Sequence, residues 1–74
     1  MNSVMTPDEY RACLHRLGET QGSAALLLGV TERTSQRYAA GDRAIPPPVV
    51  RLLWALERDS GLHVALRAWG VSAS

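Results

Sequence analysis

The sequence has a single cysteine and no long apolar run, and each of these shortages excludes a class of protein. It also has no lysine, so all of its basic residues apart from histidine are arginine. A lone Cys13 cannot form an internal disulfide bond. His15 and His63 are too scattered along the chain to complete a zinc site with it. We therefore expect an intracellular chain that holds no metal and no cofactor.

Membrane and secretory signals are also missing. The longest apolar run covers residues 24–30, whereas a membrane-spanning helix needs roughly 20 apolar residues. The first five residues lack the apolar core of a signal peptide, and the acidic pair Asp8 and Glu9 follows closely. These absences predict a soluble, cytoplasmic protein without membrane contacts.

Catalytic residue groups are equally scarce. The sequence shows no paired carboxylates, no nucleophile beside a base and no Gly-rich phosphate loop. An enzyme is the least expected class. At 74 residues the chain is one domain with a small interior, so support from a partner chain is plausible.

The segment after the first five residues carries a complete set of helix-start signals. Thr6 can accept a hydrogen bond from the backbone of Glu9, Pro7 suits the first helical turn, and Glu9 completes a capping box. This helix should end at Gly18, and its inward stripe consists of Tyr10, Cys13, Leu14 and Leu17. Residues 1–5 show no periodicity and are expected to form a flexible N-terminal arm.

Residues 21–41 predict two short helices joined by a tight turn. The first helix starts after Thr20 and ends at Gly29, whose missing Cβ allows the positive φ of the turn. The second starts after the cap Thr31, covers residues 32–40 and stops at the glycine that follows. The inward residues of the first helix are Ala24, Ala25 and Leu28.

The second of these helices has two distinct faces at 3.6 residues per turn. Its inward face holds small residues and one aromatic anchor, namely Thr31, Thr34, Ser35, Tyr38 and Ala39. Its outward face holds Glu32, Arg33, Gln36, Arg37 and Ala40. Arg can bond to guanine, Gln to adenine and Glu to cytosine in the major groove of DNA. The outward face is therefore a candidate DNA-reading surface.

Positive charge gathers at and just beyond this helix. The formal net charge is only +1, yet between Arg33 and Arg51 four arginines, Arg33, Arg37, Arg43 and Arg51, are opposed only by Asp42. The two helix arginines could simply solvate an exposed surface. Like charges four residues apart are mildly destabilising unless an anion is bound, which favours DNA.

These residues resemble the helix-turn-helix of the Cro and phage-repressor (XRE-type) family of bacterial DNA-binding proteins. The matching residues are Gln21, Ala25, Leu28, Gly29, Val30, Thr31, Tyr38 and Gly41. The resemblance covers roughly residues 6–56 and implies an all-α, lambda-repressor-like domain of four to five short helices. Ser35 departs from the family pattern, which usually has Val or Ile there, and its hydroxyl is expected to bond back to the Thr31 carbonyl.

The resemblance also implies which residues contact DNA. The base-contacting positions match Glu32, Arg33 and Arg37, with Gln36 close to the groove or backbone. The phosphate-contacting positions match Gln21, Thr31 and Arg43. A phosphate beside Gln21 would also be favoured by the positive end of the helix dipole.

The remainder of the chain predicts two more helices. Three prolines hold the loop after Gly41 extended, and Pro48 is expected to open a fourth helix that runs to about Arg58. Its core side consists of Val49, Leu52, Leu53 and Leu56. A break at residues 59–61 should lead to a short fifth helix that ends at Gly70.

The last helix allows two interpretations, which are compatible. It can pack on Trp54 within the same chain, or it can contribute to a two-fold dimer interface, where aromatic residues are enriched. The candidate dimer residues are Trp54, Leu62, Leu66 and Trp69.

The sequence thus predicts an arm (1–5), a DNA-binding domain (6–58) and a C-terminal helix and tail (59–74) with a possible dimer contact. The favoured function is a sequence-specific transcriptional regulator, a bacterial or phage repressor, that binds double-stranded DNA as a homodimer on a pseudo-palindromic site. The alternative is a protein-interaction module or antitoxin-like binder of a protein partner that uses the Trp54 and Trp69 surface.

Overall fold

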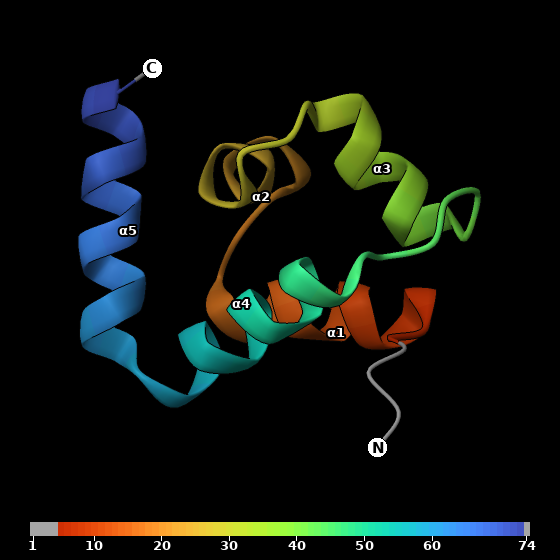
Figure 1. Ribbon diagram of the computed structural model, residues 1–74, viewed down its shortest axis with the longest axis horizontal. Helices are drawn as coiled ribbons and strands as arrows, with labels where there is room; N and C mark the ends of the chain where they lie inside the picture. Colours follow the sequence, from red (N-terminus) through yellow and green to blue (C-terminus); the bar gives the residue numbers. More distant parts are fainter. Residues whose placement is uncertain (1–4, 74) are drawn as a thin grey trace.

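Five helices and no strand make up residues 5–73, the part of the chain that the computed structural model describes, with side chains through Trp69. The helices are α1 (Pro7–Leu17), α2 (Gln21–Leu28), α3 (Glu32–Ala40), α4 (Pro47–Arg58) and α5 (Ser60–Ala73) (Figure 1). The expected all-α architecture is confirmed. In this range no helix is both long and apolar enough to cross a membrane.

The first three helices begin at the threonines that the sequence indicated. Thr6 accepts a hydrogen bond from the backbone N–H of Glu9 at 3.1 Å, and Glu9 accepts one from the backbone N–H of Thr6 at 2.8 Å. Thr20 and Ser23 form the same reciprocal capping box on α2. Thr31 caps α3 through the backbone N–H of Thr34. Local side-chain chemistry therefore fixes where these helices start.

The turn between α2 and α3 depends on Gly29. Its φ of 73° is left-handed, and its backbone N–H closes the last turn of α2. The N–H of Val30 then bonds to the Ala25 carbonyl at 3.0 Å. This arrangement satisfies carbonyls in the last turn of α2 and redirects the chain into α3 within three residues.

Two helix boundaries differ from those predicted. Helix α4 begins at Pro47 rather than Pro48, because the first turn of a helix needs no N–H donor and therefore accepts two prolines. Helix α5 begins at Ser60 because the carboxylate of Asp59 accepts a hydrogen bond from the backbone N–H of Leu62 at 3.0 Å and so caps the helix. The break is one residue long, and α5 continues past Gly70 to Ala73.

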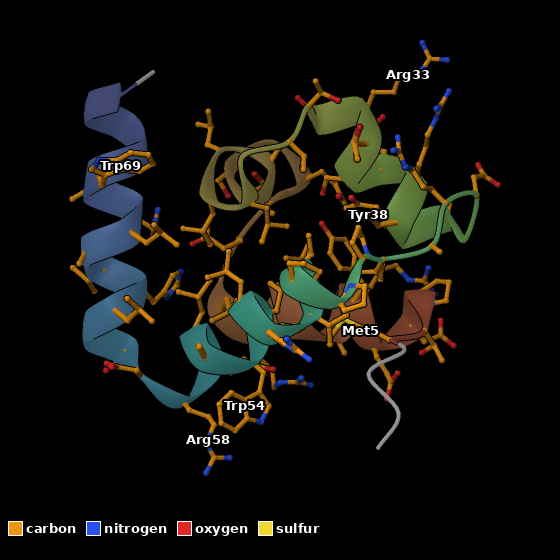
Figure 2. All side chains as sticks on the ribbon, in the orientation of Figure 1. Met5, Arg33, Tyr38, Trp54, Arg58 and Trp69 are labelled. Carbon is orange, nitrogen blue, oxygen red and sulfur yellow. The ribbon has the colours of Figure 1, made fainter. Side chains whose placement is uncertain are left out.

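The core lies where α1, α3 and α4 converge with the start of α2. The buried cluster consists of Tyr10, Cys13, Leu14, Ala24, Tyr38, Ala39, Ile45 and Leu53. Met5 packs against this cluster and is thereby part of the fold, whereas the rest of the predicted arm, residues 1–4, lies outside the described residues (Figure 2). Burial raises the pKa of the Cys13 thiol to about 12. The predicted inward position of Cys13 is confirmed, and a thiol with a raised pKa in a buried site is a poor nucleophile.

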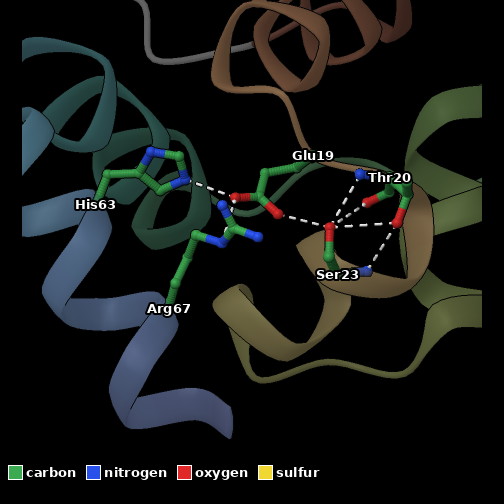
Figure 3. A network of polar contacts seen from close by, with 5 residues as sticks. All are labelled: Glu19, Thr20, Ser23, His63 and Arg67. Atoms are coloured by element: carbon green, nitrogen blue, oxygen red, sulfur yellow. Dashed lines mark hydrogen bonds and ion pairs between the residues drawn. The ribbon is translucent and has the colours of Figure 1, made fainter.

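Helix α5 is attached to the rest of the molecule through the buried carboxylate of Glu19. This side chain is fully buried, and it accepts hydrogen bonds from Ser23 Oγ at 2.5 Å and from His63 Nε2 at 2.6 Å (Figure 3). Arg67 Nε lies 3.3 Å from the same carboxylate. Since a buried charge is costly unless it is paired, these contacts hold α5 beside α2.

The environment of Glu19 sets its protonation state. Burial acts to raise its pKa, but the hydrogen bonds from Ser23 and His63 and the charge of Arg67 outweigh it. The net pKa lies below its ordinary value of 4.5. Glu19 is therefore ionised over the whole neutral range, and protonating it in acid weakens the attachment of α5.

We predict different effects for the same substitution at Gly29, which ends α2, and at Gly22 within α2. Gly29→Ala should lower the free energy of unfolding by about 1–2 kcal/mol, because an alanine is strained at φ 73° even though no atom lies within 4 Å of its Cβ. Gly22→Ala is the control: its Cβ would meet only the flexible end of Glu32 at 3.4 Å, so stability should stay equal or rise. Urea denaturation measures both, and equal losses would contradict the role given to Gly29.

We predict that Glu19 contributes acid sensitivity to the fold. A carboxylate whose pKa is lowered by folding stabilises the folded state above its unfolded pKa, and this contribution is lost as the pH falls through the folded value. Stability of the wild type should therefore decline below about pH 4.5. Glu19→Gln should cost roughly 1–3 kcal/mol at neutral pH and make the decline shallower.

The matched control is Glu57→Gln. A hydrogen bond from Arg16 is the main cause that lowers the pKa of Glu57, and this pair lies nearer the surface. Its removal should cost less than about 1 kcal/mol. Chemical denaturation at a series of pH values compares the two variants. If the free energy of unfolding of Glu19→Gln declined below about pH 4.5 as steeply as that of the wild type, Glu19 would not be the source of the acid sensitivity.

Candidate nucleic-acid interface

Helix α3 presents a polar face away from the body of the molecule. Tyr38 points into the interior, whereas Arg33 extends outward from the opposite side of the helix (Figure 2). The side chains predicted to face outward, Glu32, Arg33, Gln36, Arg37 and Ala40, are all exposed. The predicted outward face is therefore confirmed. Of the predicted inward residues, Ser35, Tyr38 and Ala39 are buried, whereas Thr34 is half-buried and the cap residue Thr31 is exposed.

A chain of buried hydrogen bonds fixes the inner face of α3 to two other helices. Ser35 Oγ donates to Gln21 Oε1 at 2.5 Å and lies 2.6 Å from the hydroxyl of Tyr10. Because the single Ser35 proton goes to Gln21, the Tyr10 hydroxyl is the donor to Ser35. The expected bond from the Ser35 hydroxyl to the Thr31 carbonyl is therefore wrong. The hydroxyl instead links α1, α3 and the first residue of α2.

Two further contacts hold α3 against α1. The rings of Tyr10 and Tyr38 pack edge to face, with centroids 5.7 Å apart and an interplanar angle of 77°. Arg11 donates to the carbonyl of Ala39 in the last turn of α3, where a positive charge is favoured by the helix dipole. Burial raises the pKa of Tyr10, so its hydroxyl stays protonated and available as a donor. The inner face of α3 is thereby rigidly positioned.

The ion pairs of the described residues leave the arginines of the predicted DNA surface uncompensated. Arg11 pairs with Asp8, Arg16 with Glu57, and Arg67 with Glu19. Arg58 lies over the ring of Trp54 at 4.7 Å. No ion pair within residues 5–73 involves Arg33, Arg37, Arg43 or Arg51. Positive charge is therefore free on α3 and on the segment that follows it.

The three predicted phosphate-contacting residues lie at element ends. Gln21 is the first residue of α2, Thr31 caps α3, and Arg43 is exposed in the loop after α3. The amide oxygen of Gln21 accepts the Ser35 bond, so its Nε2 group provides the donors that an anion requires.

The acidic residue of the outer face lies between α2 and α3. The Glu32 carboxylate is close to the backbone of Gly22, because a Cβ built there would meet its Oε1 at 3.4 Å. Gln36 Nε2 donates to Glu32 Oε2 at 3.4 Å. Glu32 and Gln36 are thus joined by a side-chain hydrogen bond one turn apart on α3. Arg33 and Arg37 have no ion-pair partner in the described residues.

The residues proposed for a dimer contact do not form one surface. Trp54 is 60% exposed and lies on α4, whereas Trp69 is 67% exposed and lies near the other end of α5 (Figure 2). The prediction that α5 packs on Trp54 is wrong, because the indole stacks with Arg58 instead. Leu62 is partly exposed and Leu66 is half-buried.

Sequence reasoning missed the polar contacts that orient the helices. No local pattern in the sequence indicates that Glu19 is buried or that it contacts His63. One signal was present: His63 and Arg67 are four residues apart in a segment that is otherwise almost entirely apolar, which places both on one face of a helix.

Comparison of the chain with protein-family models, with curated proteins and with solved structures gives no match in any of the three.

We predict that the Ser35 hydroxyl stabilises the inner face of α3. Ser35→Ala leaves both the Tyr10 hydroxyl and the Gln21 amide oxygen without this partner and should lower the free energy of unfolding by about 1–3 kcal/mol. In a double-mutant cycle with Tyr10→Phe, the double variant should lose at least about 0.5 kcal/mol less than the two single losses combined.

Gln36→Ala is the control on the same helix, and it should change stability by less than about 0.5 kcal/mol because Gln36 is exposed. Urea denaturation of the four variants and the wild type gives the values. Strict additivity of Ser35→Ala and Tyr10→Phe would rule out the coupled hydrogen bonds.

Proposed function

We propose that this chain is a sequence-specific DNA-binding transcriptional regulator of the Cro and phage-repressor (XRE-type) kind, with a lambda-repressor-like helix-turn-helix formed by α2 and α3. The observation that carries this proposal is the outward face of α3, on which Arg33 and Arg37 are exposed without ion-pair partners among the described residues. These two like charges lie four residues apart and repel each other by roughly 0.2–0.5 kcal/mol. A bound polyanion removes that cost.

The dimensions of α3 suit the major groove. An α-helix with its side chains is about 10–12 Å in diameter, and the major groove of B-DNA is roughly 12 Å wide. The nine residues of α3 form a helix short enough, at about 14 Å, to lie within one stretch of that groove. The tight turn at Gly29 lets α2 lie across the end of α3, and the buried Ser35 bonds keep the outward side chains in a fixed direction. A preorganised helix of this kind loses little conformational entropy when it binds.

Each outward side chain has a specific role in this proposal. Arg33 and Arg37 bond to guanine O6 and N7, Gln36 bonds to adenine or the nearby backbone, and Glu32 accepts from cytosine N4. Gln21, Thr31 and Arg43 contact phosphates and set the register of the helix in the groove. In this arrangement the arginines supply both affinity and base discrimination.

The regulator would act as a dimer in the cytoplasm of a bacterium. Two copies of α3 would read half-sites about 34 Å apart on a pseudo-palindromic site. Occupation of that site would exclude RNA polymerase, which makes repression the simplest mode of action.

A second candidate is a protein-interaction module or antitoxin-like binder. The strong exposure of Trp54 and Trp69 favours it, because large exposed apolar side chains often mark protein contacts. Salt dependence separates the two functions. DNA binding that neutralises several phosphates weakens steeply with added salt, whereas an apolar protein contact does not.

We predict that Arg33 and Arg43 have different effects on DNA binding. In selection from a randomised duplex pool, the wild type should enrich a two-fold-symmetric sequence. Arg33→Ala should cost about 1–3 kcal/mol on that sequence and relax the base preference at one position of each half-site. Arg43→Ala should weaken binding to every sequence and reduce the salt slope by about one unit per bound chain.

Arg58→Ala is the matched control. It removes the same charge from an exposed arginine, but Arg58 lies beside Trp54, far from Arg33 (Figure 2). Binding measured at two salt concentrations should be nearly unchanged in this variant. If the wild type enriches no sequence and its retention by DNA is insensitive to salt, the regulator function is refuted.

A further inference from the structure

Helix α5 packs on the rest of the molecule with little apolar burial. Among its side chains through Trp69, only His63 and Leu66 are partly buried, and the others are exposed. Val64 is 66% exposed and Trp69 is 67% exposed. Because burial of apolar surface is the main stabilising term in folding, α5 gains little stability from its position.

The core cluster has no member from the described part of α5. Its residues come from α1 to α4 and from the segments next to α1 and α4. The hydrogen bonds of Ser35 likewise join only α1, α2 and α3. Helix α5 stands at one end of the molecule (Figure 1). Its departure would therefore leave the core packing and the Ser35 network in place.

The polar contacts of α5 converge on the carboxylate of Glu19. His63 Nε2 lies 2.6 Å from this group and Arg67 Nε lies 3.3 Å from it, while Ser23 Oγ donates to it from α2 (Figure 3). The Arg67 side chain is 56% exposed, so water already reaches one of the two partners on α5. If α5 moves away, Glu19 becomes hydrated and keeps its bond to Ser23. Opening therefore leaves no buried charge unpaired.

Two buried leucines lie outside the core cluster, Leu27 on α2 and Leu56 on α4. Helices α2 and α4 are the elements against which α5 mainly packs. Apolar side chains that are buried outside the core need another cover, and α5 is the element placed to provide it.

We propose that α5 is a lid that opens as one unit while α1 to α4 stay folded, and that Glu19 is the contact that keeps it closed. Opening uncovers Leu27 and Leu56, so the apolar surface of α2 and α4 becomes available only in the open form. Segments with few buried apolar contacts open at a lower free energy than the core. An isolated helix of 14 residues is marginal in water, so α5 loses its own hydrogen bonds when it leaves.

The lid goes beyond the proposed function and does not depend on it. The outward residues of α3 keep their direction when α5 opens, because the bonds of Ser35 do not involve α5. Measurements on the protein without DNA test the lid, so its failure and the failure of DNA binding are separately recognisable.

Hydrogen exchange of the full chain, followed by NMR at neutral pH in low concentrations of urea, measures the opening of each helix. Amides in the middle of α5 should share one protection factor, at least about tenfold below that of the slowest amides of α1 and α3. Their dependence on urea should be weaker, because opening the lid exposes less surface than global unfolding. Equal protection in α5 and the core helices, or a gradient of protection that indicates fraying along α5, would overturn the proposal.

Two substitutions separate the lid from the core. Glu19→Gln weakens the closed form and should lower the protection of α5 roughly five- to 150-fold. Ser35→Ala weakens the closed and open forms equally, because Ser35 contacts only α1 and α2. It should lower the protection of the slowest core amides by a similar factor and leave that of α5 unchanged within about twofold.

Either of two results would contradict this division. Unchanged protection of α5 in Glu19→Gln would refute the role of Glu19. An equal fall of α5 and core protection in Ser35→Ala would show that the whole molecule opens as a single unit.

The cover over Leu27 has a test of its own. Leu27→Cys places a thiol under the lid, and the natural Cys13, which is fully buried in the core cluster, is the control within the same molecule. A thiol reagent should modify the introduced cysteine at least about tenfold faster than Cys13, because only the lid has to open. Peptide mass analysis follows both reactions, and circular dichroism checks that the variant keeps its helical content. Modification of both thiols at the same rate would contradict a lid over Leu27.

Discussion

Three helices meet at the hydroxyl of Ser35, and this meeting constrains the rest of the structure. The hydroxyl has one proton, which it gives to Gln21, so it can serve Tyr10 only as an acceptor. The directions of both bonds are thereby fixed, and a buried group left without a partner would cost about 1–3 kcal/mol. Helices α1, α2 and α3 can satisfy all three side chains only in one mutual arrangement. That arrangement fixes the rotation of α3 about its axis, so that Arg33, Gln36 and Arg37 are exposed.

The buried carboxylate of Glu19 imposes a second constraint, which acts at a distance along the chain. A charge with a fully buried side chain needs donors, and two of them come from α5, at His63 and Arg67. Both titratable residues in the described part of that helix therefore contact Glu19, and most of the side chains that it exposes are apolar. The need to pair Glu19, which lies between α1 and α2, thus determines which side of α5 faces water. The unusual exposure of Trp69 follows from the pairing of Glu19.

Local signals in the sequence were sufficient for most of the fold. Thr6, Thr20 and Thr31 each act on residues within the next turn, so the starts of α1, α2 and α3 could be read directly. The failures occurred where the structure depends on distant partners. Glu19 and His63 are 44 residues apart, and no periodicity indicates that they meet.

The same limit applied to the candidate site. Periodicity gave the exposed face of α3, because a helical wheel needs only neighbouring residues. It did not give the partners of Ser35, which lie on two other helices, or the stacking of Trp54 on Arg58 in place of α5. The arginines complete this division. Arginines that contribute to the fold pair with carboxylates, as Arg16 does with Glu57. Arg33 and Arg37, by contrast, repel each other and form no stabilising ion pair among the described residues. A rigidly held surface that costs stability in the free chain is typical of a binding site, and its positive charge is the basis on which we propose an anionic partner.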